Sequence, residues 1–304
     1  MHGGILHVNH IKDQIHCERA YRMGLSGKGI GVAVLDTGIF LHRDFDSRVT
    51  GFADMVNRRN FAYDDCGHGT HICGIIGGSG RMSGGRYSGI APGCNLIMVK
   101  VLDRKGNGYS SDVLAGISWV LERKEQLGIR ILNISVGACS KRGMSENSAL
   151  VKGVNRAWDA GLVVVVAAGN NGPRTMSITT PGISRKVITV GCSDDDREVL
   201  VGGNRMVDYS GRGPTAACIC KPDLVAPGCS VVSCSSRADK YTIKSGTSMS
   251  TPIVSGAVAL LMERFPDMSN KDVKLRLRES SVDIGLPRNQ QGWGLLDVGK
   301  MLER

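Results

Sequence analysis

Four polar side chains in this sequence stand beside apolar segments, where α/β proteins collect reactive groups. Asp36 and Asn170 each follow an apolar run, His68 stands between two glycines, and Ser248 comes shortly before an apolar, helix-like segment. The carboxyl ends of parallel strands meet at one edge of a sheet, so these side chains can converge. A carboxylate, an imidazole, a hydroxyl and an amide are together what acyl transfer requires: an orienting group, a base, a nucleophile and an oxyanion donor.

Each of these residues alone also has an ordinary structural explanation. A strand-end aspartate and an Asn-Gly pair are common in turns. Ser248 could be a helix N-cap, as could Ser250 and Thr251. His71 competes with His68 for the role of base. If Ser248 stands at the start of that helix, it lies at the positive end of the helix dipole, which favours a developing negative charge.

The segments around these residues resemble, in the same order, four signature motifs of the subtilisin-like serine proteases. They are residues 34–38, 67–71, 168–170 and 246–252, and the likeness extends from about residue 20 to residue 302. Each motif alone is moderately specific, whereas four in order are very specific. The order Asp, His, Ser along the chain is also the subtilisin order. The sequence looks most like bacterial members of the family that lack a secretion signal.

The resemblance implies a serine endopeptidase that forms an acyl-enzyme on Ser248. His68 would take the proton of the Ser248 hydroxyl, and Asp36 would hold the imidazole in the correct tautomer. Asn170 and the Ser248 backbone N–H would bind the oxyanion. This chemistry needs no cofactor.

The resemblance also raises the question of a structural calcium. Asp44 is similar to a carboxylate that ligates calcium in many relatives. Its expected partner loop, residues 79–87, contains two arginines and no Asn or Asp, which disfavours a hard cation. Asp44 is therefore a candidate calcium ligand, although the composition of residues 79–87 argues against a calcium site.

The resemblance implies, in addition, a cleft that binds the substrate as an extended strand. Backbone hydrogen bonds of that type are largely independent of sequence, so peptides or unfolded proteins are the expected substrates. Asn171 matches a position that lines the pocket for the residue before the scissile bond, and its neutral side chain predicts a preference for apolar or neutral residues there. The residues on the two sides of the cleft are Gly106, Asn107 and Gly108, and Ser135, Val136, Gly137 and Ala138.

Apolar runs alternate with helix-like segments along the chain, which predicts an α/β fold: a doubly wound, mostly parallel sheet with helices on both faces. We expect a single domain over residues 1–304, with an N-terminal segment at residues 1–19 and no recognisable pro-domain. The expected strands are residues 30–35, 95–101, 131–135, 162–168 and 186–190. The expected helices are residues 111–126, 145–160, 251–265 and 270–279.

Composition and charge exclude several other classes of protein. Of the 304 residues, 41% are hydrophobic and 22% are charged, which is typical of a globular protein. The net charge of +10 comes from short basic clusters mixed with acids, so no nucleic-acid partner is expected. The longest apolar run, residues 162–168, is too short to span a bilayer, so no membrane partner is expected. The oligomeric state stays open.

The start of the chain bears on its location. It lacks both a cationic segment and an apolar core, so we see no secretory signal and expect a cytoplasmic protein, or a secreted one if the chain is a processed or truncated form. The ten cysteines are then expected to be reduced. Cys66 and Cys73 flank the His68 motif, so thiol reagents are expected to block access to the imidazole.

Two alternatives come from the class of binding proteins. One is a protease-like protein in which the same residues do not reach a productive geometry. The other is a zinc-stabilised binding module, because zinc-competent side chains gather in two short segments, although their spacing fits the usual zinc motifs poorly. Those side chains are Cys66, His68, His71, Cys73, Cys218 and Cys220. A fluorophosphonate probe that labels Ser248 would distinguish an enzyme from either alternative.

Overall fold

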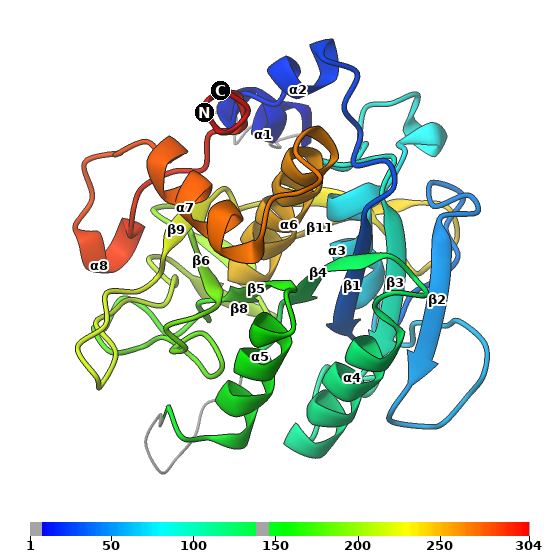
Figure 1. Cartoon of the computed structure of the whole chain (residues 1–304), viewed down its shortest axis with the longest axis horizontal. Coiled ribbons are helices and arrows are strands. Elements are labelled where there is room, and N and C mark those ends of the chain that lie inside the picture. Colours follow the sequence, from blue (N-terminus) through cyan, green and yellow to red (C-terminus); the bar gives the residue numbers. More distant parts are fainter. Residues whose placement is uncertain (1–7, 138–145, 304) are drawn as a thin grey trace.

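The computed structural model describes residues 8–137 and 146–303, and its centre is a seven-stranded parallel sheet (Figure 1). Each pair of neighbouring strands in this sheet is parallel. In spatial order the strands are β2 (Val49–Asp54), β3 (Asn95–Lys100), β1 (Gly31–Asp36), β4 (Ile129–Ile134), β5 (Val163–Ala167), β6 (Ile188–Cys192) and β9 (Leu224–Ala226). Every residue of β1, β5 and β6 is buried, which explains why their sequences are almost wholly apolar.

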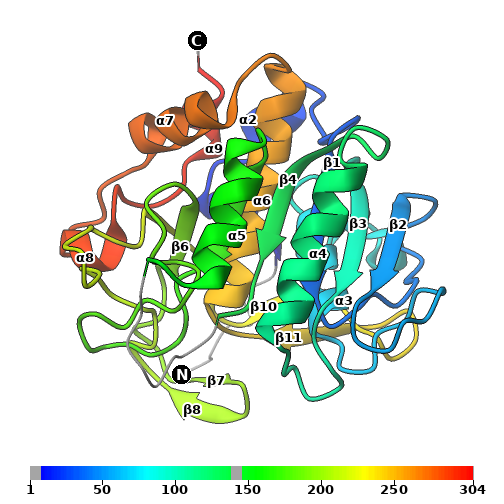
Figure 2. The same cartoon turned by 60° about the horizontal axis from the view of Figure 1, so that its bottom comes forward.

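Helices cover both faces of the sheet. On one face, α3 (His68–Gly77) packs against α6 (Thr247–Arg264), and α6 also contacts β4, β5 and β6. On the other face, α4 (Ser110–Arg123) packs against α5 (Ala149–Asp159). Figure 2 shows α4 and α5 in front of the sheet and α6 behind it. The prediction of a doubly wound α/β fold is therefore confirmed.

Smaller elements surround this core. Two antiparallel hairpins lie outside the main sheet, β7 (Val199–Val201) with β8 (Asn204–Met206) and β10 (Val231–Cys234) with β11 (Tyr241–Lys244). The remaining helices are α1 (Val8–Gln14), α2 (Glu18–Arg22), the 3₁₀ turn η1 (Arg81–Ser83), α7 (Asn270–Ser280), α8 (Arg288–Gln291) and α9 (Val298–Met301). None of the helices in the described part of the chain is long and apolar enough to cross a membrane.

The five predicted strands and four predicted helices are all present, with some differences at their ends. One difference concerns α6, which begins at Thr247 and not at residue 251. Pro252 therefore lies inside the helix and not at its first turn. Ser248 is consequently in the first turn of α6. Strands β2 and β9 were not predicted, because β2 mixes exposed and buried residues and β9 has only three residues.

Candidate active site

The strand order brings three of the candidate segments together. Strands β1, β4 and β5 are neighbours and run in parallel, so their carboxyl ends lie at one edge of the sheet. Asp36 is the last residue of β1, Ser135 follows β4 directly, and Asn170 follows β5 after two residues. At this point the chain order changes direction across the sheet, the place where α/β proteins bind ligands.

Asp36 and His68 form a direct contact. His68 begins α3, and its Nδ1 lies 2.7 Å from Oδ1 of Asp36, whose side chain is fully buried. Burial alone would lower the pKa of His68, but the charge and hydrogen bond of Asp36 outweigh burial and raise this pKa above its usual value. Donation from Nδ1–H to the carboxylate leaves Nε2 as the basic nitrogen of the neutral ring.

The start of α3 is held in place by a buried network. Oδ2 of Asp64 accepts the Thr70 N–H at 2.9 Å, and Oδ1 of Asp64 accepts the Thr37 hydroxyl at 2.9 Å. The same Thr37 hydroxyl accepts the Gly69 N–H at 2.9 Å. A Cβ at Gly69 would lie 2.2 Å from the carbonyl oxygen of Gly38, so only glycine allows the helix to approach β1 this closely.

The competing base His71 faces away from the site. Its Nε2 lies 3.1 Å from the carbonyl oxygen of Val231 and 3.2 Å from that of Thr242, between the strands of the β10–β11 hairpin. Burial, aided by the nearby charge of Lys244, lowers its pKa to about 3. His71 is therefore a neutral core residue, and His68 is the histidine at the strand edge.

Ser248 faces the same pocket as His68 but is not bonded to it. Its hydroxyl donates to the carbonyl oxygen of Ser135 at 2.7 Å. The structure shows no hydrogen bond between Ser248 and His68. Both residues line a pocket of about 460 Å³ together with Asn170. Rotation about the Cα–Cβ bond of Ser248 redirects the hydroxyl within this pocket.

The amide of Asn170 is fixed by the residue before Ser248. Its Oδ1 accepts both the backbone N–H and the hydroxyl of Thr247, each at 3.0 Å. The Thr247 hydroxyl in turn accepts the Gly169 N–H at 3.2 Å. Because Oδ1 is occupied in this way, Nδ2 of Asn170 is the group left to donate towards the pocket. Thr247 was not among the residues predicted from the sequence, although it lies within the motif at residues 246–252.

Lys100 is a second residue that the sequence analysis missed. It is the last residue of β3, its side chain is fully buried, and it pairs in register with Asp36. Its Nζ donates to the carbonyl oxygens of Thr37 at 2.6 Å and Leu102 at 2.7 Å, and it forms an ion pair with Asp65 at 2.7 Å. Lys100 thus holds the turn after Asp36. The feature of the sequence that could have indicated Lys100 is its position, as a lysine at the end of an apolar run.

The residues assigned to the cleft line a continuous groove. Gly106, Asn107 and Gly108 line a pocket that also includes Val136 and Gly137. This pocket shares Gly106, Val136 and Gly137 with the pocket of His68 and Ser248, which Ser135 and Asn171 also line. Ala138 lies outside the described residues.

A third pocket continues the groove beyond Ser248. It has a volume of about 590 Å³ and shares His68, Asn170, Gly202, Lys244 and Ser248 with the second pocket. The groove therefore has one end at the 106–108 and 135–137 segments and the other end at the β7–β8 hairpin, with Ser248 between them.

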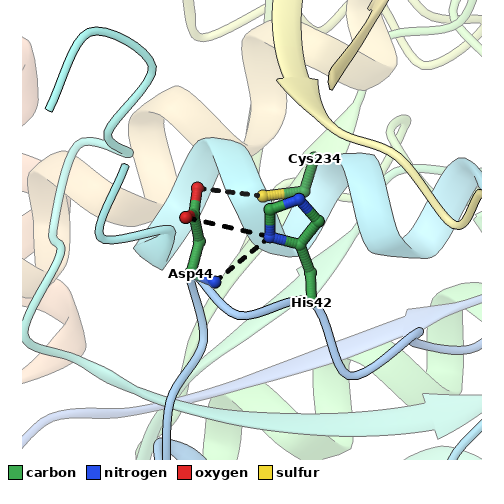
Figure 3. A group of neighbouring side chains, drawn as sticks. All are labelled: His42, Asp44 and Cys234. Carbon is green, nitrogen blue, oxygen red and sulfur yellow. Dashed lines mark hydrogen bonds and ion pairs between the residues drawn. The ribbon is translucent and has the colours of Figure 1, made fainter. Parts of the chain in front are cut away.

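The side chain of Asp44, the candidate metal ligand, is engaged in hydrogen bonds. Figure 3 shows its carboxylate facing Cys234 and His42. Oδ1 accepts the Met82 N–H at 2.9 Å, and Oδ2 accepts the Tyr241 hydroxyl at 2.7 Å. The Cys234 thiol lies 3.7 Å from Oδ2, and Nδ1 of His42 accepts the Asp44 N–H at 3.1 Å. The carboxylate is thus surrounded by hydrogen-bond donors, whereas calcium needs a cage of oxygen ligands.

A guanidinium group occupies the adjacent carbonyl oxygens. Arg48 donates to the carbonyl oxygens of Asp44 at 2.6 Å, Gly77 at 2.5 Å and Cys94 at 3.3 Å. These oxygens are of the type that hard cations use, and here an arginine takes them.

The zinc alternative also lacks support. Two groups of close, potentially metal-binding side chains occur within residues 8–137 and 146–303: His42, Asp44 and Cys234, and Cys192, Asp194 and Cys229. Neither contains the cysteines and histidines on which the alternative rested. Thiols of the second group donate to Asp194, from Cys192 to Oδ1 at 3.1 Å and from Cys229 to the carbonyl oxygen at 2.8 Å. The cysteines in the described part of the chain are all free.

A comparison with known families identifies the class of protein. Residues 27–294 match the peptidase S8 model, which describes the subtilase family. This match covers most of the chain, so the chain belongs to the subtilase family, and the enzyme is a serine endopeptidase, a hydrolase that acts on peptide bonds. Members of this family need no cofactor for catalysis.

Individual relatives agree with this assignment. The chain is 42% identical over 285 residues to the serine protease AprX of Bacillus subtilis (strain 168), an alignment that covers 88% of this chain and 64% of AprX. It is 33% identical to subtilisin Savinase of Lederbergia lenta, over 94% of this chain and 95% of Savinase. Among solved structures, sphericase is similar with a TM-score of 0.75 and 31% identity, over 90% of this chain and 93% of sphericase.

The relatives also correct the expected location. One of them is named the minor extracellular protease Epr of Bacillus subtilis (strain 168), and it is 32% identical over 93% of this chain. The family thus includes extracellular enzymes, and the prediction of a cytoplasmic protein is wrong. That prediction rested on the first residues of the sequence alone, which do not decide where a protease of this family acts.

Proposed function

We propose that this enzyme cleaves peptide bonds through an acyl-enzyme on Ser248, with Asp36, His68 and Ser248 as its catalytic triad. The observation that carries the proposal is the 2.7 Å contact between Nδ1 of His68 and the buried carboxylate of Asp36, with Ser248 in the same pocket. His68 takes the proton of the Ser248 hydroxyl through Nε2 and later gives it to the leaving amine. Asp36 holds the tautomer that leaves Nε2 basic and stabilises the imidazolium that forms.

Asn170 supplies one half of the oxyanion hole in this proposal. Thr247 occupies Oδ1 of Asn170, so Nδ2 is the donor that faces the reacting carbonyl. The second donor is the backbone N–H of Ser248, which lies in the first turn of α6 and so has no partner within the helix. Two fixed donors stabilise charge that develops only in the transition state.

Substrate binding would complete the triad. Residues 135–137 follow the carboxyl end of β4, and their backbone can form hydrogen bonds with an extended peptide. The Ser135 carbonyl oxygen, which now accepts the Ser248 hydroxyl at 2.7 Å, would instead accept a substrate N–H. The displaced hydroxyl then turns to Nε2 of His68. Catalytic hydrogen bonds of this kind often form only in the substrate complex.

The substrates of this enzyme are peptides or proteins, and we propose that they are unfolded chains or flexible loops. An extended segment that pairs with Gly106–Gly108 and Ser135–Gly137 must leave its own secondary structure first. We propose that Asn171 lines the pocket for the residue before the scissile bond and favours apolar or neutral residues there. The catalytic unit in this proposal is one domain over residues 1–304.

Digestion of a denatured proteome tests this proposal. The released peptides are identified by mass spectrometry, with Ser248→Ala as the matched inactive control. The proposal expects many cleavages in the wild type and none above background in Ser248→Ala, with neutral or apolar residues before the cut. Cleavage mainly after Lys or Arg would overturn the role of Asn171, and equal cleavage by both proteins would overturn the role of Ser248.

A further inference from the structure

Lys244 places a positive charge in the groove beside the reacting groups. It is the last residue of β11 and is half-buried. It lines the pocket that holds His68 and Ser248, and also the third pocket that continues beyond them. Its charge acts on the pKa of both His68 and His71, which places it close to the catalytic histidine.

In the part of the chain that the structure describes, no carboxylate is paired with Lys244. Within residues 8–137 and 146–303, no aspartate or glutamate forms an ion pair with Lys244. The described residues that line the two pockets include Lys244 and Lys105 but no Asp or Glu. A cleft lined by charges of one sign concentrates its field and attracts ligands of the opposite sign.

The geometry of the groove shows which part of a substrate meets Lys244. In the proposed function, the residues before the scissile bond pair with the 135–137 segment at one end of the groove. A chain that passes over Ser248 must then continue into the third pocket, between Lys244 and the β7–β8 residues Gly202 and Met206. The residues after the scissile bond, which leave first as the fragment with the new amino terminus, therefore lie beside Lys244.

We propose that Lys244 is a specificity-determining residue, which selects substrates with an Asp or Glu at the first or second position after the scissile bond. This inference rests on the proposed function, because it uses the direction in which the substrate crosses Ser248. The rest of the pocket is compatible with such a substrate, since Gly202, Gly203 and Met206 offer no competing charge. A lysine at these substrate positions would face Lys244 and be disfavoured.

Matched peptides test the inference. Internally quenched peptides share one sequence and differ only in carrying Glu, Gln or Lys at the first or second position after the cut. At low salt we expect the wild-type kcat/KM to be about threefold to tenfold higher with Glu than with Lys, the range of a partly exposed charge pair. The ratio of kcat/KM with the Glu peptide to kcat/KM with the Lys peptide should approach one at about 0.5 M salt. It should also approach one in Lys244→Gln, and it should fall below one in Lys244→Glu.

A remote substitution controls for net charge. Lys271→Glu changes the charge of the protein by the same amount but lies exposed on α7, away from the groove. It should retain the wild-type ratio. The inference is overturned if the wild type cleaves Glu and Lys peptides equally, or if its preference persists in Lys244→Glu. Both results leave the proposed function intact. The proposed function fails only if no peptide is cleaved and Ser248 is not labelled by a fluorophosphonate.

Discussion

The hydroxyl of Ser248 donates to the carbonyl oxygen of Ser135 at 2.7 Å, while His68 keeps its 2.7 Å contact with Asp36. The orienting pair of the proposed triad is thus in contact, and the proposed nucleophile donates to the residue that follows β4. In the proposed function, a substrate N–H takes the place of the Ser248 hydroxyl at this carbonyl oxygen, and the hydroxyl then turns to His68.

The contact between Asp36 and His68 predicts a defined pH dependence. Only neutral His68 can act as base, so kcat/KM rises with pH as His68 loses its proton. Asp36 raises the pKa of His68, which places this rise above pH 6.5, the usual value for histidine. In Asp36→Asn the rise should move to lower pH, and kcat should fall by about 10⁴-fold, because the tautomer is no longer held.

The matched control is Asp267→Asn, which removes an exposed carboxylate far from the site. It should leave both kcat and the pH profile unchanged. An Asp36→Asn profile whose midpoint stays in place, or moves to higher pH, would mean that Asp36 does not set the protonation of His68.

The network around Asn170 predicts a graded loss of kcat. Asn170→Ala removes the proposed oxyanion donor and should lower kcat by about 10²-fold to 10³-fold. Thr247→Val removes one of the two hydrogen bonds that orient the amide and should lower kcat by about tenfold. Thr247→Ser keeps the hydroxyl and should restore kcat. A Thr247→Val enzyme with unchanged kcat would show that the backbone N–H alone fixes the amide.

The hydrogen bonds of Asp44 predict that its contribution to stability is independent of calcium. Asp44→Asn weakens the charged acceptor for Tyr241 and the Met82 N–H, at a cost of about 1–3 kcal/mol in the free energy of unfolding. The loss should be equal in calcium chloride and in EDTA, as measured by chemical denaturation. If calcium stabilises the wild type but not Asp44→Asn, then Asp44 is a calcium ligand after all.

The position of Cys66 predicts slow, pH-dependent inhibition by thiol reagents. Cys66 lines the pocket of His68, and burial, with the nearby charges of Asp64 and Asp36, raises the pKa of its thiol. Alkylation by iodoacetamide should therefore be slow at pH 7, accelerate as the pH rises, and reduce activity by obstructing the pocket. Cys73 is buried and should not react in the folded protein.

Cys66→Ser should remain active under the same treatment. The exposed thiols of Cys218 and Cys220 provide an internal control, because their alkylation should proceed without loss of activity. Inhibition that persists in Cys66→Ser would assign the sensitive thiol to another position.

Local motifs explain how much of the site could be predicted from the sequence. Asp36, His68 and Asn170 lie within short segments whose glycines and strand ends fix the backbone around them. The contacts that complete the site join distant segments. Thr247 orients Asn170 across 77 residues, and the Ser248 hydroxyl meets a carbonyl 113 residues away. No local pattern predicts whether the Ser248 hydroxyl donates to the Ser135 carbonyl oxygen or to Nε2 of His68.

The same distinction explains the strands of the main sheet that were missed and the contacts of Asp44 that were not foreseen. The pattern of apolar runs found the buried strands, but β2 is half exposed and β9 has three residues, so neither has a strong signal. The composition of residues 79–87 argued against calcium, yet it could not reveal that Arg48 takes the carbonyl oxygens of Gly77 and Cys94. That contact depends on the tertiary fold.

Covalent labelling tests whether Ser248 is an activated nucleophile. A fluorophosphonate reacts with a serine only where a base and an oxyanion hole activate it, and peptide mapping by mass spectrometry then locates the modified residue. The account predicts stoichiometric labelling at Ser248 in the wild type, and none in Ser248→Ala or His68→Ala. A folded wild-type protein that stays unlabelled, or that is labelled at another serine, would contradict it.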